Sequence, residues 1–158
     1  MTETDITEAM ETPSLYERLG GIFGIAAIMD VLVDRLFANV WANRNPYVAA
    51  MHERNGRPGF KFMVTAWSVE QTGGPKCYPG RDMHYAHVDM VATEHDFDVV
   101  ALEIAATLSF CGVGVQEQKE YLEIIESYRR EVIDAPANER AKQTKAADRQ
   151  AGQEVPTY

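Results

Sequence analysis

The sequence has few cysteines, few basic residues and no long hydrophobic run. Its two cysteines, Cys77 and Cys111, form no CxxC motif and no second pair, which excludes a disulfide framework. Lysine and arginine number 15 against 24 acidic residues, and the net charge of -9 argues against nucleic-acid binding because a polyanion repels phosphate backbones. No apolar run reaches the length of about 18 residues that a membrane span needs. The acidic, polar start from Met1 to Glu11 is unlike a signal peptide, so we expect a cytoplasmic protein without membrane insertion.

The composition predicts one folded domain between two polar ends. The chain has 158 residues, of which 46% are hydrophobic, and a domain of this size can bury a core without disulfides. Residues 1–12 are rich in Thr and Glu, and we expect a flexible segment there. Residues 135–158 hold few apolar anchors, which predicts a disordered tail. The folded domain is therefore predicted to span residues 13–134.

Helical periodicity dominates this domain. Apolar residues recur at helical spacing within 25–40, 60–71, 97–111 and 121–132. Strand-like alternation is not sustained in any segment, so the predicted fold class is all-α. Residues 43–58 are rich in Asn, Pro and Gly and predict a loop.

Two short motifs predict where helices begin. Ser14 with Glu17 matches the S-x-x-E capping box ahead of a short first helix. Thr93 with Asp96 predicts the start of the helix that carries the third apolar stripe. Cys111 ends that stripe, and we expect it in the core.

The connection between the second and third stripes is long and rich in glycine and proline. Gly73-Gly74-Pro75 and Pro79-Gly80 precede a short helix predicted between Arg81 and Met90, and this helix carries His87. Ordinary helix bundles keep such connections short, so a shaped loop with a histidine suggests that a ligand is held there. A histidine by itself is more often structural or solvated, and we expect His52 and His95 at the surface.

The run G-G-P-x-x-Y-x-G-R-x-M-x-x-x-H from Gly73 to His87, followed by F-D at Phe97, resembles the haem-binding core of group I truncated haemoglobins. The opening S-L-Y-E-R-L-G-G is similar to the start of that family, and the resemblance covers about residues 14–133. It implies a two-over-two helical sandwich around haem b, with His87 as the proximal ligand and metal-binding residue. A neutral imidazole is a good axial ligand and leaves the opposite face open to a diatomic gas.

The same resemblance implies the other haem contacts. Met83 and Phe97 would pack against the proximal face, and Tyr47 would stand in for the ring that wedges the haem. Lys61, Arg57 and Arg81 are the nearest candidates in the sequence to pair with the propionates, and ordinary surface charge stays open for all three. The residues expected to bind the cofactor are His87, Met83, Tyr78, Arg81, Phe97, Phe60, Val64, Val33, Lys61 and Tyr47.

The distal side departs from the family pattern. Val33 stands where family members have a tyrosine, and Phe60 and Val64 stand at the other distal positions. Each absent hydrogen bond to a charged group forgoes roughly 1.5–3 kcal/mol, so we expect fast oxygen loss and easy autoxidation, with CO and NO binding less affected. His52 or Met63 remains open as a sixth ligand. Trp67 or Tyr47 remains open as a donor, although we favour core packing for Trp67.

Three functions stay open. The first is a haem protein that binds O2, NO or CO for carriage, sensing or NO dioxygenation, with a reductase as a partner in the last case. The apolar pocket argues against efficient catalysis, so a gas-binding protein is favoured over an enzyme. The second is a globin-fold signalling or interaction module that has lost haem. The third is a non-haem metal site on His84 and His87. We expect a monomer or a weak homodimer.

Overall fold

The computed structural model describes residues 12–136, 139–140, 143 and 146. Within these residues every regular element is a helix, which confirms the predicted all-α class. In chain order the elements are α1 (Leu15–Arg18), α2 (Gly21–Ala38), the 3-10 helix η1 (Ala42–Arg44), α3 (Pro46–Asn55), α4 (Arg57–Gln71), α5 (Met83–His87), α6 (Glu94–Phe110) and α7 (Val115–Ser127). None of these helices is long and apolar enough to cross a membrane.

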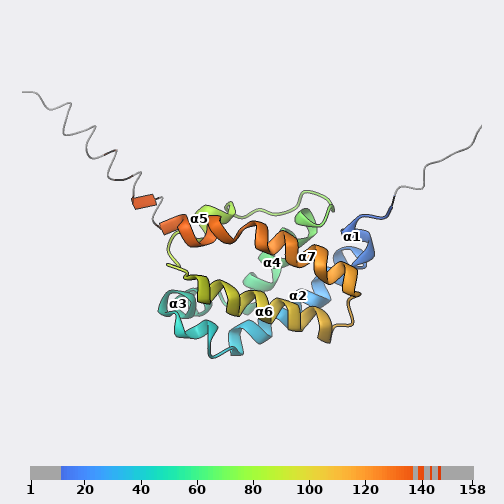
Figure 1. The fold of residues 1–158 in the computed structure, drawn as a ribbon, viewed down its shortest axis with the longest axis horizontal. Coiled ribbons are helices and arrows are strands. Elements are labelled where there is room, and N and C mark those ends of the chain that lie inside the picture. Colours follow the sequence, from blue (N-terminus) through green and yellow to red (C-terminus); the bar gives the residue numbers. More distant parts are fainter. Residues whose placement is uncertain (1–11, 137–138, 141–142, 144–145, 147–158) are drawn as a thin grey trace, which may run out of the picture.

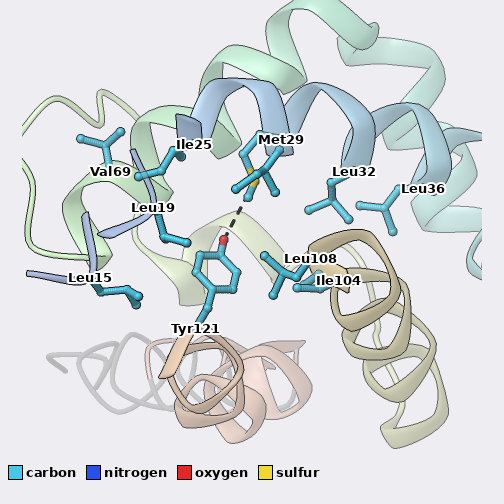
Figure 2. Packing of buried hydrophobic residues seen from close by; sticks show 11 residues of the cluster. Leu15, Leu19, Ile25, Met29, Leu32, Leu36, Val69, Ile104, Leu108 and Tyr121 are labelled. Atoms are coloured by element: carbon cyan, nitrogen blue, oxygen red, sulfur yellow. Dashed lines mark hydrogen bonds between the residues drawn. The ribbon is translucent and has the colours of Figure 1, made fainter. Parts of the chain in front are cut away.

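Two helix pairs form the body of the molecule. Helix α2 packs along α4, α6 packs along α7, and α2 also contacts α6. Figure 1 shows α6 and α7 in front of α2 and α4, with the short α5 close to the end of the chain. The core lies where the pairs meet, and Figure 2 shows Tyr121 of α7 pointing from one pair toward Met29 of α2 in the other.

Both predicted helix starts are present, and each is a capping box. The Ser14 hydroxyl accepts a hydrogen bond from the backbone N–H of Glu17, whose carboxylate accepts from the Ser14 backbone N–H at 2.8 Å. Thr93 and Asp96 make the same reciprocal pair at the start of α6. Each box satisfies two of the backbone donors that a helix start leaves without partners.

The loop predicted for residues 43–58 is wrong, because this segment contains α3. The Asn45 side chain accepts hydrogen bonds from the backbone N–H groups of Tyr47 and Val48, and Pro46 occupies the first turn, where a missing N–H costs nothing. Gly56, with φ of 67°, then ends α3 and begins α4. The residues that predicted a loop are therefore the boundaries of a helix.

Two side chains also differ from the expectation. His52 was expected at the surface but is 8% exposed, because α3 packs it beneath the end of α2. Cys111 was expected in the core but is exposed. Helix α6 ends at Phe110, so Cys111 caps it and leaves the stripe that faces the core. His95 is exposed, as predicted.

The chain stays helical beyond α7. After a turn at Tyr128, residues 129–136 are helical, and Val132 and Ala135 are buried. The first two residues of the expected tail, 135 and 136, therefore belong to a packed helix. Residues 1–11 of the proposed flexible segment and most of the proposed tail lie outside the described residues.

Candidate functional site

His87 is the last residue of α5, a helix of five residues. The Asp82 side chain caps this helix by accepting a hydrogen bond from the Tyr85 backbone N–H at 2.9 Å. The Nδ1 of His87 lies 2.8 Å from the Met83 carbonyl oxygen. Since a carbonyl only accepts, Nδ1 carries the proton and the lone pair is on Nε2.

The surroundings keep this imidazole neutral. Burial lowers the pKa of His87, and this effect outweighs the opposing influences of the Met83 carbonyl and the Glu131 carboxylate. A neutral ring with Nδ1–H held by a backbone carbonyl is the form in which a histidine binds a metal through Nε2.

The loop ahead of α5 is fixed to α4 by Tyr78. Its backbone N–H donates to a Glu70 carboxylate oxygen at 2.6 Å, and its hydroxyl donates to the Arg81 carbonyl at 2.9 Å. A side chain at Gly80 would meet the Tyr78 ring at 2.3 Å and the Met63 methyl at 2.5 Å. The glycine is therefore required for the loop to approach α4 this closely.

Met83 begins the helix that ends at His87, and Phe97 lies in α6, the next helix along the chain. Phe97 is buried at the start of α6, and the Arg129 guanidinium lies 4.4 Å from its ring centre. Met83 is half-buried at the start of α5 and supplies the carbonyl that holds the imidazole. Their contact with a cofactor stays a prediction.

Helices α2 and α4 present apolar side chains at the predicted distal positions. Val33 of α2 is fully buried, and Phe60 and Val64 of α4 are half-buried. Phe60 and Val64 are four residues apart and so share one face of α4. None of these three side chains can donate the hydrogen bond that a tyrosine would supply.

Sequence reasoning missed an aromatic stack beside these positions. The His52 ring lies parallel to Phe37 at 4.1 Å and meets Phe60 edge-on at 5.9 Å. Its Nδ1 lies 2.9 Å from the Asn43 side-chain oxygen, and the Asn43 amide nitrogen donates to carbonyls of α2 and its cap. Burial lowers the pKa of His52. The stack was missed because residues 43–58 were predicted as a loop, whereas α3 orients His52 toward the interior.

The basic residues expected near the propionates have protein partners. Lys61 pairs with Asp30 at 2.8 Å and Asp34 at 3.0 Å, and Arg57 pairs with Asp34 at 3.0 Å. These pairs tie α4 to α2. Arg81 is exposed on the loop that leads to α5. The propionate role of all three cations stays a prediction.

The two aromatic residues considered as donors lie apart from each other. Trp67 meets the Tyr128 ring edge-on at 5.6 Å, which fits the packing role that we favoured. Tyr47 is 53% exposed at the start of α3. Its role as a wedge against haem stays a prediction.

The described residues hold no group of three or more His, Cys, Asp or Glu side chains that could bind a metal ion. The imidazole Nε2 of His84 instead lies 3.5 Å from a Glu139 carboxylate oxygen. The alternative of a non-haem site on His84 and His87 therefore gains no third ligand of these types from the described part of the chain.

Comparison with known proteins assigns the family. The sequence model of bacterial-like globins matches residues 14–134. A Group 1 truncated hemoglobin of Tetrahymena thermophila is 29% identical over 126 residues, which cover 77% of this chain and 95% of that protein. The crystal structure of truncated hemoglobin from Tetrahymena pyriformis in the Fe(III) form is 26% identical, with a TM-score of 0.67 over 77% of this chain and 98% of that one.

A second solved structure agrees with this assignment. The 2/2 hemoglobin from a Synechococcus species, solved in the cyanomet state with covalently attached heme, is 25% identical to this chain. It superposes with a TM-score of 0.68 over 77% of this chain and 99% of its own. The chain therefore belongs to the bacterial-like globin family and has the two-on-two fold of the truncated haemoglobins.

Proposed function

We propose that this chain binds haem b, with Nε2 of His87 as the axial ligand. The observation that carries the proposal is the 2.8 Å contact between Nδ1 of His87 and the Met83 carbonyl. It leaves Nε2 with a free electron pair on a neutral ring, which fits the ligand that a haem iron requires on its proximal side.

The other residues fit an apolar, planar cofactor. Met83 and Phe97 would cover its proximal face, and Val33, Phe60 and Val64 would cover the opposite face. Tyr78 and Arg81 belong to the loop that would close around one edge. All the fully buried side-chain nitrogen and oxygen atoms of the described residues already have hydrogen-bond partners, so none of these atoms needs the cofactor as a partner.

We further propose that the function is binding of O2, NO or CO, for carriage, sensing or NO and O2 chemistry. When bound, the haem iron would supply reversible binding of a diatomic ligand at the face that Val33, Phe60 and Val64 would cover. The valine and phenylalanine side chains of α2 and α4 exclude water from that face and donate no hydrogen bond. Oxygen would therefore be released quickly and autoxidation would be easy, whereas CO would be held almost as well as in a polar pocket.

The test is haem content in the purified protein and in a His87→Ala variant. A pyridine haemochrome assay on protein from haem-replete cells should give one haem b per wild-type chain. The His87→Ala variant should lose haem or show an altered ferrous spectrum. Colourless wild-type protein would contradict the proposal and favour a haem-free interaction module, for which the ion pairs that occupy Lys61 and Arg57 are the supporting observation.

A further inference from the structure

The helical segment after α7 lies against α5. In Figure 1 the orange and red end of the chain runs beside α5. The backbone N–H of His84 donates to a Glu131 carboxylate oxygen at 3.1 Å, and the His84 imidazole faces Glu139 at 3.5 Å. Glu139 lies beyond residue 134, where the match to the globin family ends.

Helix α5 needs such support because it is very short. Helices of five residues do not persist in water, since the cost of forming the first turn is not recovered. Its first-turn N–H groups have carboxylate acceptors from two sides: Asp82 accepts from Tyr85, and Glu131 accepts from His84. One acceptor belongs to α5's own cap, and the other comes from 47 residues further along the chain.

We propose that Glu131 is a positioning residue for His87, which holds α5 and thereby sets the orientation and electronic character of the proximal imidazole. The inference rests on the proposed haem function. The path runs through two hydrogen bonds: Glu131 holds the backbone of His84, and the adjacent Met83 carbonyl holds Nδ1 of His87. Partners of metal-bound histidines fix ring orientation and raise ligand basicity in this way.

The negative charge of Glu131 should also affect the reduction potential of the haem iron. The Glu131 carboxylate oxygen lies 3.1 Å from the His84 backbone nitrogen, and the carbonyl of the same peptide bond holds Nδ1 of His87, so this negative charge lies close to the proximal ring. A negative charge near the iron favours the ferric over the ferrous state. Loss of the charge should therefore raise the reduction potential, whereas loss of the hydrogen bond should loosen α5.

Three variants separate these effects. Glu131→Ala removes both charge and acceptor, Glu131→Gln removes the charge but keeps an oxygen acceptor, and Glu123→Gln is a matched control on α7. The Glu123 side chain is 66% exposed and pairs with Lys119 at 3.9 Å on its own helix. The measurements on the haem-loaded protein are the rate of haem transfer to an acceptor globin, the iron–histidine stretching band by resonance Raman spectroscopy, and the reduction potential.

We expect Glu131→Ala to lose haem about 10-fold faster, the lower end of the range for partners of metal ligands, with a shifted iron–histidine band. Glu131→Gln should lose haem at close to the wild-type rate and yet have a higher reduction potential. Glu123→Gln should match the wild type in all three measurements.

A wild-type haem-transfer rate and iron–histidine band in Glu131→Ala would overturn the inference. If Glu131→Ala does not fold, the reduction potential of Glu131→Gln decides, and an unchanged potential overturns it as well. Failure of the wild type to hold haem at all is a separate result, which contradicts the proposed function first.

Discussion

At the scale of the residue, the two faces of the candidate site depend on very few side chains. On one face the Nδ1–H of His87 donates to the Met83 carbonyl, which leaves the Nε2 lone pair available for the proposed bond to iron. On the other face Val33, Phe60 and Val64 offer methyl groups and a ring where the family has hydrogen-bond donors. The proposed ligand chemistry follows from this asymmetry.

A glutamine at position 64 should restore a distal donor. Val64 is half-buried and shares a face of α4 with Phe60, so a longer polar side chain at this position would lie on the face predicted to be distal. A hydrogen bond to a charged group is worth roughly 1.5–3 kcal/mol, so Val64→Gln should slow oxygen release at least about 10-fold. Stopped-flow measurement of oxygen and CO dissociation tests this, with Val64→Met as the apolar control. Equal oxygen dissociation rates in the two variants would show that the wild-type pocket already has a donor.

His52 should make the protein less stable in mild acid. Burial lowers its pKa below the ordinary 6.5, so below about pH 6.5 the unfolded chain takes up a proton that the native state refuses. The free energy of unfolding should therefore fall as the pH drops from about 7 to about 5. His52→Phe keeps a ring against Phe37 and should reduce that fall.

Urea unfolding at several pH values in this range measures the effect of His52. Burial also lowers the pKa of His87, but that contribution is common to both proteins and cancels in the comparison. An identical pH dependence in wild type and His52→Phe would mean that this ring is protonated as easily in the native state as in the unfolded chain.

At the scale of the element, helices whose signals are local were predictable from the sequence. The helix starts at Ser14 and Thr93 and the short helix at His87 were predicted because their residues interact within three or four positions. Helix α3 was missed because Asn, Pro and Gly mark helix ends as well as loops. The inward orientation of His52 followed from α3 and was therefore missed with it.

Asn45 should contribute more stability than an ordinary helix cap. Its side-chain oxygen caps α3, and its amide nitrogen donates to the Met90 carbonyl and to Asp96 of α6, each at 3.1 Å. The residue is 8% exposed, so Asn45→Ala should lower the free energy of unfolding by about 2 kcal/mol. Asn45→Ser keeps a cap acceptor but loses the hydrogen bonds to Met90 and Asp96. Its free energy of unfolding should therefore lie between those of the wild type and Asn45→Ala. A Ser variant no more stable than the Ala variant would show that the cap contributes little.

At the scale of the whole molecule, one polar contact joins the two helix pairs inside an apolar core. The Tyr121 hydroxyl lies 2.8 Å from the Ser68 hydroxyl and 3.9 Å from the sulfur of Met29. Burial raises the pKa of Tyr121 to about 12, so the phenol stays protonated and can donate. Sequence periodicity placed Tyr121 on an apolar stripe, but it could not identify a partner 53 residues away.

Tyr121→Phe should destabilise the protein although it keeps the ring. The Ser68 hydroxyl is fully buried and would lose its phenol partner, at a cost of about 1–3 kcal/mol. Adding Ser68→Ala removes this hydroxyl, whose remaining hydrogen bond is to the Met29 sulfur at 3.6 Å, and should recover part of that loss. Denaturant unfolding of the two single variants and the double variant tests the coupling, and strictly additive losses would show that the two hydroxyls act independently.

The proposed function depends on a bond between the Nε2 atom of His87 and the haem iron. The absorption spectrum of the ferrous protein, recorded for wild type and for His87→Gly with and without added imidazole, tests it most directly. We predict a five-coordinate ferrous spectrum for the wild type, its loss in His87→Gly, and its return when imidazole occupies the vacated position. A His87→Gly protein whose ferrous spectrum is the same as that of the wild type, before any imidazole is added, would contradict the account.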